Sequence, residues 1–173
     1  TTLNERGRDD EGSVTPDIHA LDSFDYFGKY HRLLAGGVTT VHIAPGRNRL
    51  MPGYGAVVKL AADAPDQQVL KAVSGLSVVL GEAPKNPPPI FEPPVPPEPD
   101  NQVKPAELQL PTTRMGQMAM LRNLFSRATW TREAAKPLDD QTEAILPVLD
   151  KDQSLRVNCH TAQDIRNALA LAK

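Results

Sequence analysis

The sequence lacks several features that would point to particular classes of protein. A single cysteine, Cys159, among 173 residues excludes an internal disulfide and any zinc site built from cysteines. No apolar run approaches the roughly 20 residues that a membrane-crossing helix needs. Basic residues are not in excess, since 19 Lys and Arg stand against 21 Asp and Glu. We therefore expect a soluble protein whose partners include neither a membrane nor a nucleic acid.

The start of the chain is also poor in apolar residues, and no targeting segment is recognisable there, so the compartment is not predicted. We expect residues 1–22 to form a polar arm or a surface loop, because they cannot bury enough apolar surface to offset the entropy of ordering. Residues 23–173 carry the apolar spacing of a folded segment. These two ranges are the predicted division of the chain.

Proline is abundant and unevenly distributed. Of the 17 prolines, 11 lie in the stretch 84–111. Such a density is incompatible with a helix or a central strand. The stretch is therefore predicted to be an extended, polyproline-like excursion over the surface. It is either a spacer, which we favour, or a ligand for a domain with an aromatic groove.

Outside the polar start and the proline-rich stretch, the spacing of apolar residues changes between that of a strand and that of a helix. Three nearly continuous apolar runs and one shorter run predict strands, at 38–45, 55–61, 75–81 and 154–158. Helical spacing predicts helices at 24–34, 67–73, 112–128 and 139–149, and a last one that begins at Thr161. Continuous apolar runs favour parallel strands that are covered on both faces. Thr161 and Asp164 have the spacing of a capping box at the start of the last helix.

Alternating strands and helices are typical of βα units in an α/β fold. Four strands are too few to close a barrel, which normally takes about 250 residues. The predicted fold is therefore a partial (β/α)8 TIM-barrel segment with a long proline-rich loop. Open strand edges and uncovered helix faces need a partner, so we expect another protein chain, or a second copy of this one, to complete the barrel.

Four blocks of the sequence resemble the metal-dependent amidohydrolase superfamily, in the branch similar to imidazolonepropionases and prolidase-like hydrolases. The blocks are GGVTTVHIAPGRNRLMPGYGAVVKL (36–60), LGEAPKN (80–86), TTRMGQMAMLRNLFSRA (112–128) and LRVNCHTAQDIRNALALAK (155–173). The resemblance implies a (β/α)8 barrel whose strand ends hold one or two divalent metals, zinc, iron or manganese. It also implies that a metal-activated water attacks an amide or a related C–N bond.

Carried over residue by residue, the resemblance implies an incomplete, degenerate metal site. Glu82 matches a strand-end ligand of the family, and His160 matches the second histidine of the His-Ala-His block. Asn158 stands where that block has its first histidine, and an amide is a poor substitute for imidazole. The His-x-His pair that opens the family's barrel is missing from this sequence. We therefore expect the chain alone to bind no metal.

Three residues are candidates for substrate contacts or for the rim of the site: Asn158, Arg114 and His42. Arg114, in the PTTRMG block, either binds a carboxylate bidentately or is a surface arginine at a helix start. His42 follows a buried run and either faces the barrel mouth or is a core histidine with its hydrogen bonds satisfied.

Two functions of different classes remain open at this point. The chain is either a segment of an amidohydrolase-like enzyme, inactive by itself, or a non-catalytic scaffold that acts as the structural partner of an active amidohydrolase-like chain. Whether the chain is an enzyme is therefore left undecided. The substrate, the metal and the oligomeric state are not predicted by the sequence.

Overall fold

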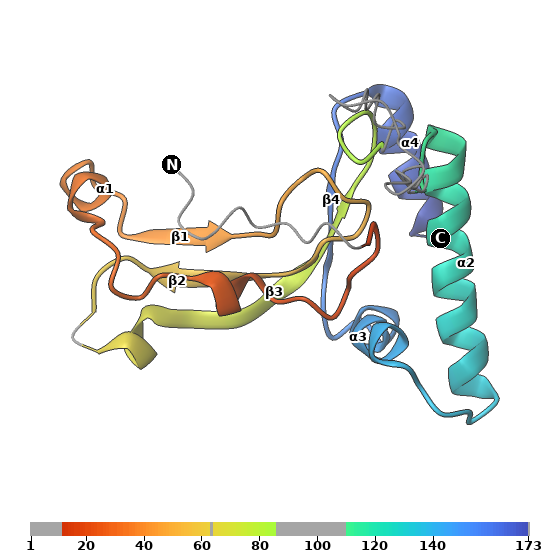
Figure 1. Ribbon diagram of the computed structural model, residues 1–173, viewed down its shortest axis with the longest axis horizontal. Coiled ribbons are helices and arrows are strands. Elements are labelled where there is room, and N and C mark those ends of the chain that lie inside the picture. Colours follow the sequence, from red (N-terminus) through yellow and green to blue (C-terminus); the bar gives the residue numbers. More distant parts are fainter. Residues whose placement is uncertain (1–11, 63, 86–109, 173) are drawn as a thin grey trace, which may run out of the picture.

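The computed structural model describes residues 12–62, 64–85 and 110–172. The fold is mixed α/β, with a curled half-barrel sheet of strand order β1-β2-β3-β4. The helices α2, α3 and α4 gather around the β4 end, and α1 lies at the opposite end (Figure 1). The strands are β1 (Thr40–Ile43), β2 (Gly53–Lys59), β3 (Val69–Val79) and β4 (Leu155–Asn158). The helices are η1 (Ala20–Ser23), α1 (His31–Ala35), η2 (Pro65–Gln68), α2 (Arg114–Glu133), α3 (Asp140–Leu149) and α4 (Ala162–Leu171).

Strand direction differs from the expectation of a parallel sheet. β1 pairs with β2 and β2 pairs with β3 in antiparallel fashion, whereas β3 pairs with β4 in parallel. The continuous apolar run in β2 has another cause, because its first four residues are all buried and successive residues point to opposite faces. β2 is continuously apolar because both of its faces are buried. Such a run therefore does not require parallel pairing.

Two of the expected helices are wrong. The stretch 67–73 forms η2 and then the start of β3, in which Val69 pairs with Val58 of β2. The stretch 24–34 begins as a turn, because the Asp25 side chain accepts a hydrogen bond from the backbone N–H of Phe27. α1 starts only at His31. Cross-strand pairing and a local turn thus override helical spacing at these two places.

The remaining elements agree with the sequence. α2 begins at Arg114 with Thr113 as its N-cap, and α3 continues two residues past Pro147. α4 begins as the capping box predicts, since the Thr161 side chain accepts a hydrogen bond from Asp164 N at 3.1 Å. β4 lies within the fourth expected strand.

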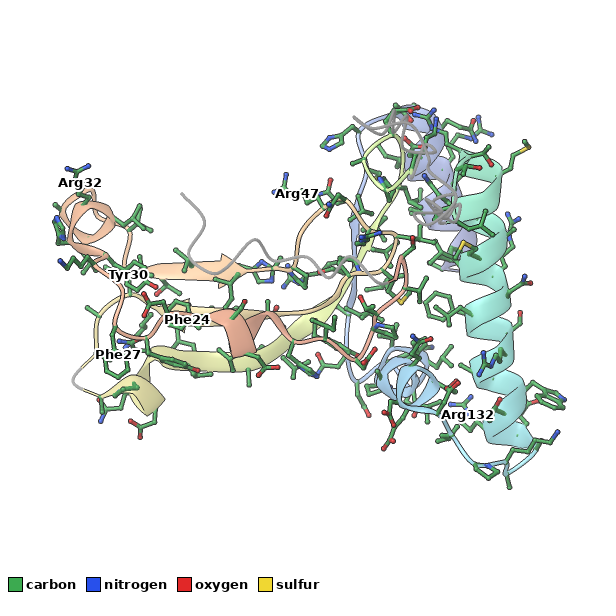
Figure 2. All side chains as sticks on the ribbon, in the orientation of Figure 1. Phe24, Phe27, Tyr30, Arg32, Arg47 and Arg132 are labelled. Carbon is green, nitrogen blue, oxygen red and sulfur yellow. The ribbon has the colours of Figure 1, made fainter. Side chains whose placement is uncertain are left out.

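Two apolar clusters form the core. The larger one lies where α2 and α3 pack on the β3–β4 end of the sheet, with Leu76, Leu121 and Ile145 fully buried. The hydroxyl of Tyr54 in β2 donates to the carbonyl of Ala144 in α3 at 2.6 Å, so it also fixes the helix to the sheet. The smaller cluster joins β1 and β2 to η1 around Phe24, which Figure 2 labels near Tyr30.

The described part of the first 22 residues lies along β2. Backbone hydrogen bonds join Ser13 and Thr15 to Met51, and Tyr54 N donates to Ile18 O at 2.7 Å. Gly53, with φ of +113°, allows this close approach, since a Cβ there would lie 2.2 Å from Ile18 O. The division into an arm at 1–22 and a folded segment at 23–173 stays a prediction.

The fold is compatible with part of a barrel, because β3, α2, α3, β4 and α4 follow one another as a parallel βα arrangement. Most of the proline-rich stretch 84–111 lies outside the described residues, so its predicted conformation is not tested. Within the described ranges, none of the helices combines the length and the apolar character that crossing a bilayer requires.

Candidate functional site

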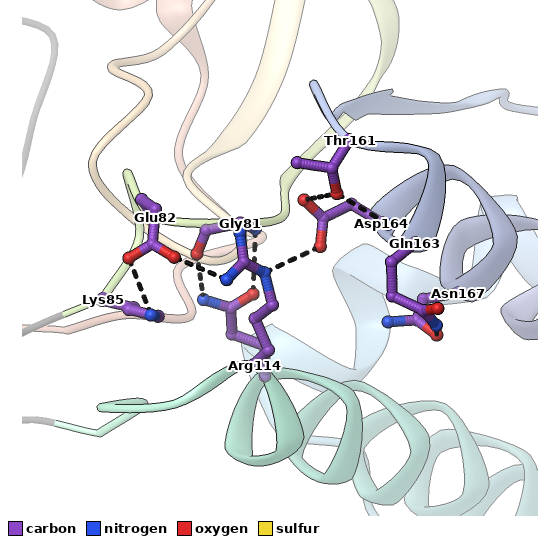
Figure 3. A network of polar contacts seen from close by, with 9 residues as sticks. Gly81, Glu82, Lys85, Arg114, Thr161, Gln163, Asp164 and Asn167 are labelled. Atoms are coloured by element: carbon purple, nitrogen blue, oxygen red, sulfur yellow. Dashed lines mark hydrogen bonds and ion pairs between the residues drawn. The ribbon is translucent and has the colours of Figure 1, made fainter.

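A cluster of polar side chains lies at the carboxyl ends of the two parallel strands, where barrels carry their active sites (Figure 3). We call it the strand-end cluster, and its members come from the segment after β3, from the first turns of α2 and from the start of α4. They are the side chains of Glu82, Lys85, Arg114, Gln117, Thr161 and Asp164, together with the backbone of Gly81.

Arg114 is the centre of the cluster. Its Nη1 donates to Glu82 Oε1 at 2.5 Å, and its Nε donates to Asp164 Oδ1 at 3.1 Å. Because Arg114 is the first residue of α2, its guanidinium joins three segments that are far apart in the sequence. The cation therefore ties the end of β3 to the start of α4.

Asp164 is the buried carboxylate of the cluster, with its side chain only 2% exposed. The Thr161 hydroxyl lies 2.6 Å from Asp164 Oδ2, so both carboxylate oxygens have a hydrogen-bond partner. Hydrogen bonding from Thr161, and then from Arg114, holds the pKa of the Asp164 carboxyl below its usual range. A buried charge is tolerated here because it is paired and hydrogen-bonded.

Glu82 is exposed, and both of its oxygens are also bound by cations. Lys85 Nζ lies 2.7 Å from Oε2, and Arg114 binds Oε1. The Lys85 ammonium, followed by the Arg114 guanidinium, lowers the pKa of the Glu82 carboxyl. Glu82 is therefore ionised at neutral pH, and its charge is neutralised within the chain.

Gln117 is a member that the sequence reasoning missed. Its side chain is 1% exposed, and it forms two hydrogen bonds with the backbone of Gly81, to the carbonyl at 2.7 Å and from the N–H at 3.1 Å. The signal in the sequence is its position three residues after Arg114. Residues at that spacing lie on the same helix face, so Gln117 faces the same strand end.

The candidate residues from the sequence lie in four places. Glu82 and Arg114 are in contact within the strand-end cluster. Asn158 ends β4, half-buried, and its backbone carbonyl accepts a hydrogen bond from Leu80 N at 2.9 Å. His160 is exposed in the loop before α4, and its ring has no hydrogen-bond partner among the described residues. His42 lies in β1, away from this cluster, bound to Ser74 of β3.

The donor chemistry of the cluster does not fit a catalytic metal. A divalent cation needs carboxylate or imidazole donors that face it, and the oxygens of Glu82 and Asp164 are already bound by Arg114, Lys85 and Thr161. Across the described parts of the chain, no group of three or more His, Cys, Asp or Glu side chains is arranged to hold a metal ion.

Comparison with known proteins gives one informative result. The chain is similar to an amidohydrolase from Thermotoga maritima MSB8, with a TM-score of 0.73 and 28% sequence identity over 98% of this chain. It spans 42% of the length of that protein. No family model matches the chain, and no curated protein matches it.

This similarity supports a general amidohydrolase relationship, and the chain is an amidohydrolase-like segment with a mixed α/β fold. Amidohydrolases in general are metal-dependent, as the resemblance in the sequence implied. In the strand-end cluster, the Arg114 guanidinium lies between the carboxylates of Glu82 and Asp164.

Proposed function

We propose that this chain is a segment of a (β/α)8 barrel in the imidazolonepropionase and prolidase-like branch of the amidohydrolases. The family activity is metal-dependent hydrolysis of amide or other C–N bonds. Support comes from the 28% identity that extends over 98% of the chain, and from the parallel pair β3–β4 with α2 and α4 after its strands. The proline-rich stretch 84–111 is, in this proposal, the loop that joins β3 to α2.

We further propose that the chain alone hydrolyses nothing and that its metal site is degenerate. The observation that carries this is the position of Arg114, whose guanidinium bridges Glu82 and Asp164. A cation supplied by the protein takes the place that a metal would need beside the strand-end carboxylate. The cluster then holds β3, α2 and α4 together, and the remaining donors of an active site belong to other sequence.

The experiment is a measurement of metal content and turnover on the purified chain. The protein is incubated with zinc, manganese or ferrous iron, dialysed, and analysed by atomic emission. It is then assayed against dipeptides and cyclic amides. We expect less than stoichiometric metal and no hydrolysis. One retained metal per chain that is lost in Glu82→Gln but kept in Glu143→Gln, an exposed residue of α3, would contradict the proposal.

A second candidate function, a non-catalytic structural partner of an active amidohydrolase-like chain, is favoured by the uncovered surfaces of β4 and α4. β4 pairs with β3 on one side, and no described strand pairs with its other side. On α4, Ile165 and Leu169 lie one turn apart and are 47% and 63% exposed. An unpaired strand edge can pair with a strand of another chain, and an exposed apolar stripe can pack against one.

Light scattering after size-exclusion chromatography tests this candidate. We expect a mass above that of the 18.8 kDa chain, from self-association or from a co-purified partner. A single species at the monomer mass, unchanged on dilution and concentration, would argue against a structural partner role.

A further inference from the structure

The four strands of the sheet contain basic side chains and no acidic ones. Their basic residues are His42, Lys59, Lys71 and Arg156, and all four are exposed. None of the residues in β1–β4 is Asp or Glu, although the whole chain carries a net charge of -2. The positive charges of Lys59, Lys71 and Arg156 are therefore not neutralised by acidic residues within the sheet.

These basic residues lie on one face of the sheet. Residues that pair directly across two strands point to the same side, and so do residues two apart along a strand. His42 and Lys71 both pair with Val57, and Lys59 lies two residues after Val57. Arg156 pairs with Ser77 of β3, and Ser77 pairs with Gly53 of β2. Gly53 and Val57 are four residues apart along β2, so they belong to the same face of that strand. We call this surface the basic face.

Two of these side chains converge on a single residue of β3. His42 Nε2 and Ser74 Oγ are hydrogen-bonded at 2.7 Å, and Arg156 Nε donates to the carbonyl of Ser74 at 3.2 Å. Ser74 is itself 1% exposed, so it is a fixed anchor. Within the described residues, the terminal nitrogens of Arg156 and Nδ1 of His42 have no hydrogen-bond partner.

Two glycines form the floor between these side chains. Gly55 and Gly75 pair directly across β2 and β3. A Cβ on Gly55 would lie 2.7 Å from His42 Nε2, and one on Gly75 would lie 3.1 Å from Arg156 Nε. Glycine inside strands often marks a place where another group approaches the backbone closely. Because Gly55 and Gly75 have no side chains, the His42 imidazole and the Arg156 guanidinium can lie close to the backbone of the sheet.

From this arrangement we propose that His42 and Arg156, anchored on Ser74 above the glycine pair, bind a small oxyanion, a carboxylate or a phosphate group. Arg156 offers its planar N–H fork, which suits the paired oxygens of these anions. His42 supplies a ring nitrogen on the opposite side, and Lys59 and Lys71 add to the positive potential of the basic face. The site is separate from the strand-end cluster and does not depend on the proposed barrel.

The electrostatics of His42 agree with this geometry. Partial burial, and then the nearby charge of Arg156, lower the pKa of the His42 imidazole. The proximity of the two side chains rests on their contacts with Ser74, where His42 Nε2 meets Oγ and Arg156 Nε meets the carbonyl. An oxyanion bound between them would offset the repulsion between the guanidinium and a protonated imidazole.

The test is a titration of the whole chain with inorganic phosphate and, separately, with acetate at low ionic strength. Binding is followed by the NMR signal of the His42 ring and by calorimetry. We expect saturable binding of at least one anion. Arg156→Gln should weaken it by about tenfold, as expected for a lost charge-assisted contact, while Arg122→Gln on the exposed side of α2 should leave it unchanged.

Each outcome of the titration either supports or contradicts the proposed oxyanion site. Saturation with phosphate alone identifies a phosphate group, with acetate alone a carboxylate, and with both a general oxyanion site. No saturable shift of His42 with either anion, or equal weakening in both arginine variants, overturns the proposal. If Arg156→Gln does not fold by circular dichroism, Ser74→Ala is used, since it removes the hydroxyl that binds the His42 ring. Unchanged binding in that variant overturns the proposal as well.

Discussion

Arg114 is the residue on which the strand-end cluster depends, because it contacts carboxylates from two other segments. Arg114→Gln leaves the Asp164 carboxylate buried without its cationic partner, so we expect a lower midpoint of urea unfolding. Arg122→Gln, two turns further along the same helix, changes an exposed side chain and should leave the midpoint unchanged. Equal midpoints for the two variants would show that the contact does not stabilise the fold.

Asp164 makes stability depend on pH in a defined direction. Its folded pKa lies below the ordinary value of 3.8, because Thr161 and Arg114 bind the ionised form. As pH falls, the unfolded chain takes up this proton first. The contribution is therefore complete above the ordinary pKa and is lost as pH falls through the folded pKa. We expect the unfolding free energy of Asp164→Asn to fall less steeply between neutral pH and pH 3 than that of the unchanged chain.

The prediction concerns the difference in unfolding free energy between Asp164→Asn and the unchanged chain, measured at each pH. Asp139, whose pKa is also lowered, lies outside the cluster and remains in the variant, so its contribution cancels in the comparison. Glu82 shares Arg114 with Asp164, so the measured difference includes the coupling between these two carboxylates. Parallel pH profiles for the two chains would show that Asp164 does not carry this dependence.

At the residue scale, the sequence identified only part of the candidate site. Glu82 and Arg114 were both identified, yet as a metal ligand and as a rim residue, and the structure shows them as an ion pair. Their contact joins positions 32 residues apart, across a stretch with no regular period. Asp164 was recognised for its capping role alone, because a sequence does not show which buried carboxylate an arginine will reach.

At the scale of single elements, the most constrained contact is the one between β2 and the segment before η1. Gly53→Ala should destabilise the fold by more than about 1 kcal/mol, because a positive φ and a Cβ 2.2 Å from Ile18 O both oppose it. Gly37→Ala is the matched control, since Gly37 has a φ of +83° but nothing within 4 Å of its Cβ.

Hydrogen exchange separates the two effects of the Gly53 change. Tyr54 N donates to Ile18 O, so exchange at this amide should accelerate in Gly53→Ala beyond what global unfolding explains. In Gly37→Ala the same amide should keep its protection. Equal exchange at Tyr54 in both variants would mean that the close approach at Gly53 does not hold the segment.

Helix ends were easier to predict than strand direction, for a physical reason. The Thr161 side chain caps α4 by accepting a hydrogen bond from Asp164 N, which is only three residues away. Strand direction depends on partners that are distant in sequence, and the same apolar run suits either pairing once both faces are covered. β2 shows this, since burial on both sides accompanies antiparallel neighbours.

For the whole molecule, the apolar stripe of α4 is the surface that should decide association. Leu169→Glu places a charge on this stripe, and we expect it to reduce the mass observed by light scattering towards the monomer. Met115→Glu is the control, because Met115 is 81% exposed on another helix. A mass that falls equally in both variants would indicate non-specific aggregation through exposed apolar groups.

The single tryptophan gives this chain an internal reporter that needs no label. Trp130 lies near the end of α2 opposite to Arg114, with Lys136 Nζ 3.9 Å from its ring centroid. A helix of 20 residues is about 30 Å long, so the indole is remote from the strand-end cluster. Its emission will therefore follow loosening at the carboxyl end of α2, whereas exchange of the amides near Gly81 will follow loosening at the strand-end cluster. A difference between the two signals will show which end of the helix opens first.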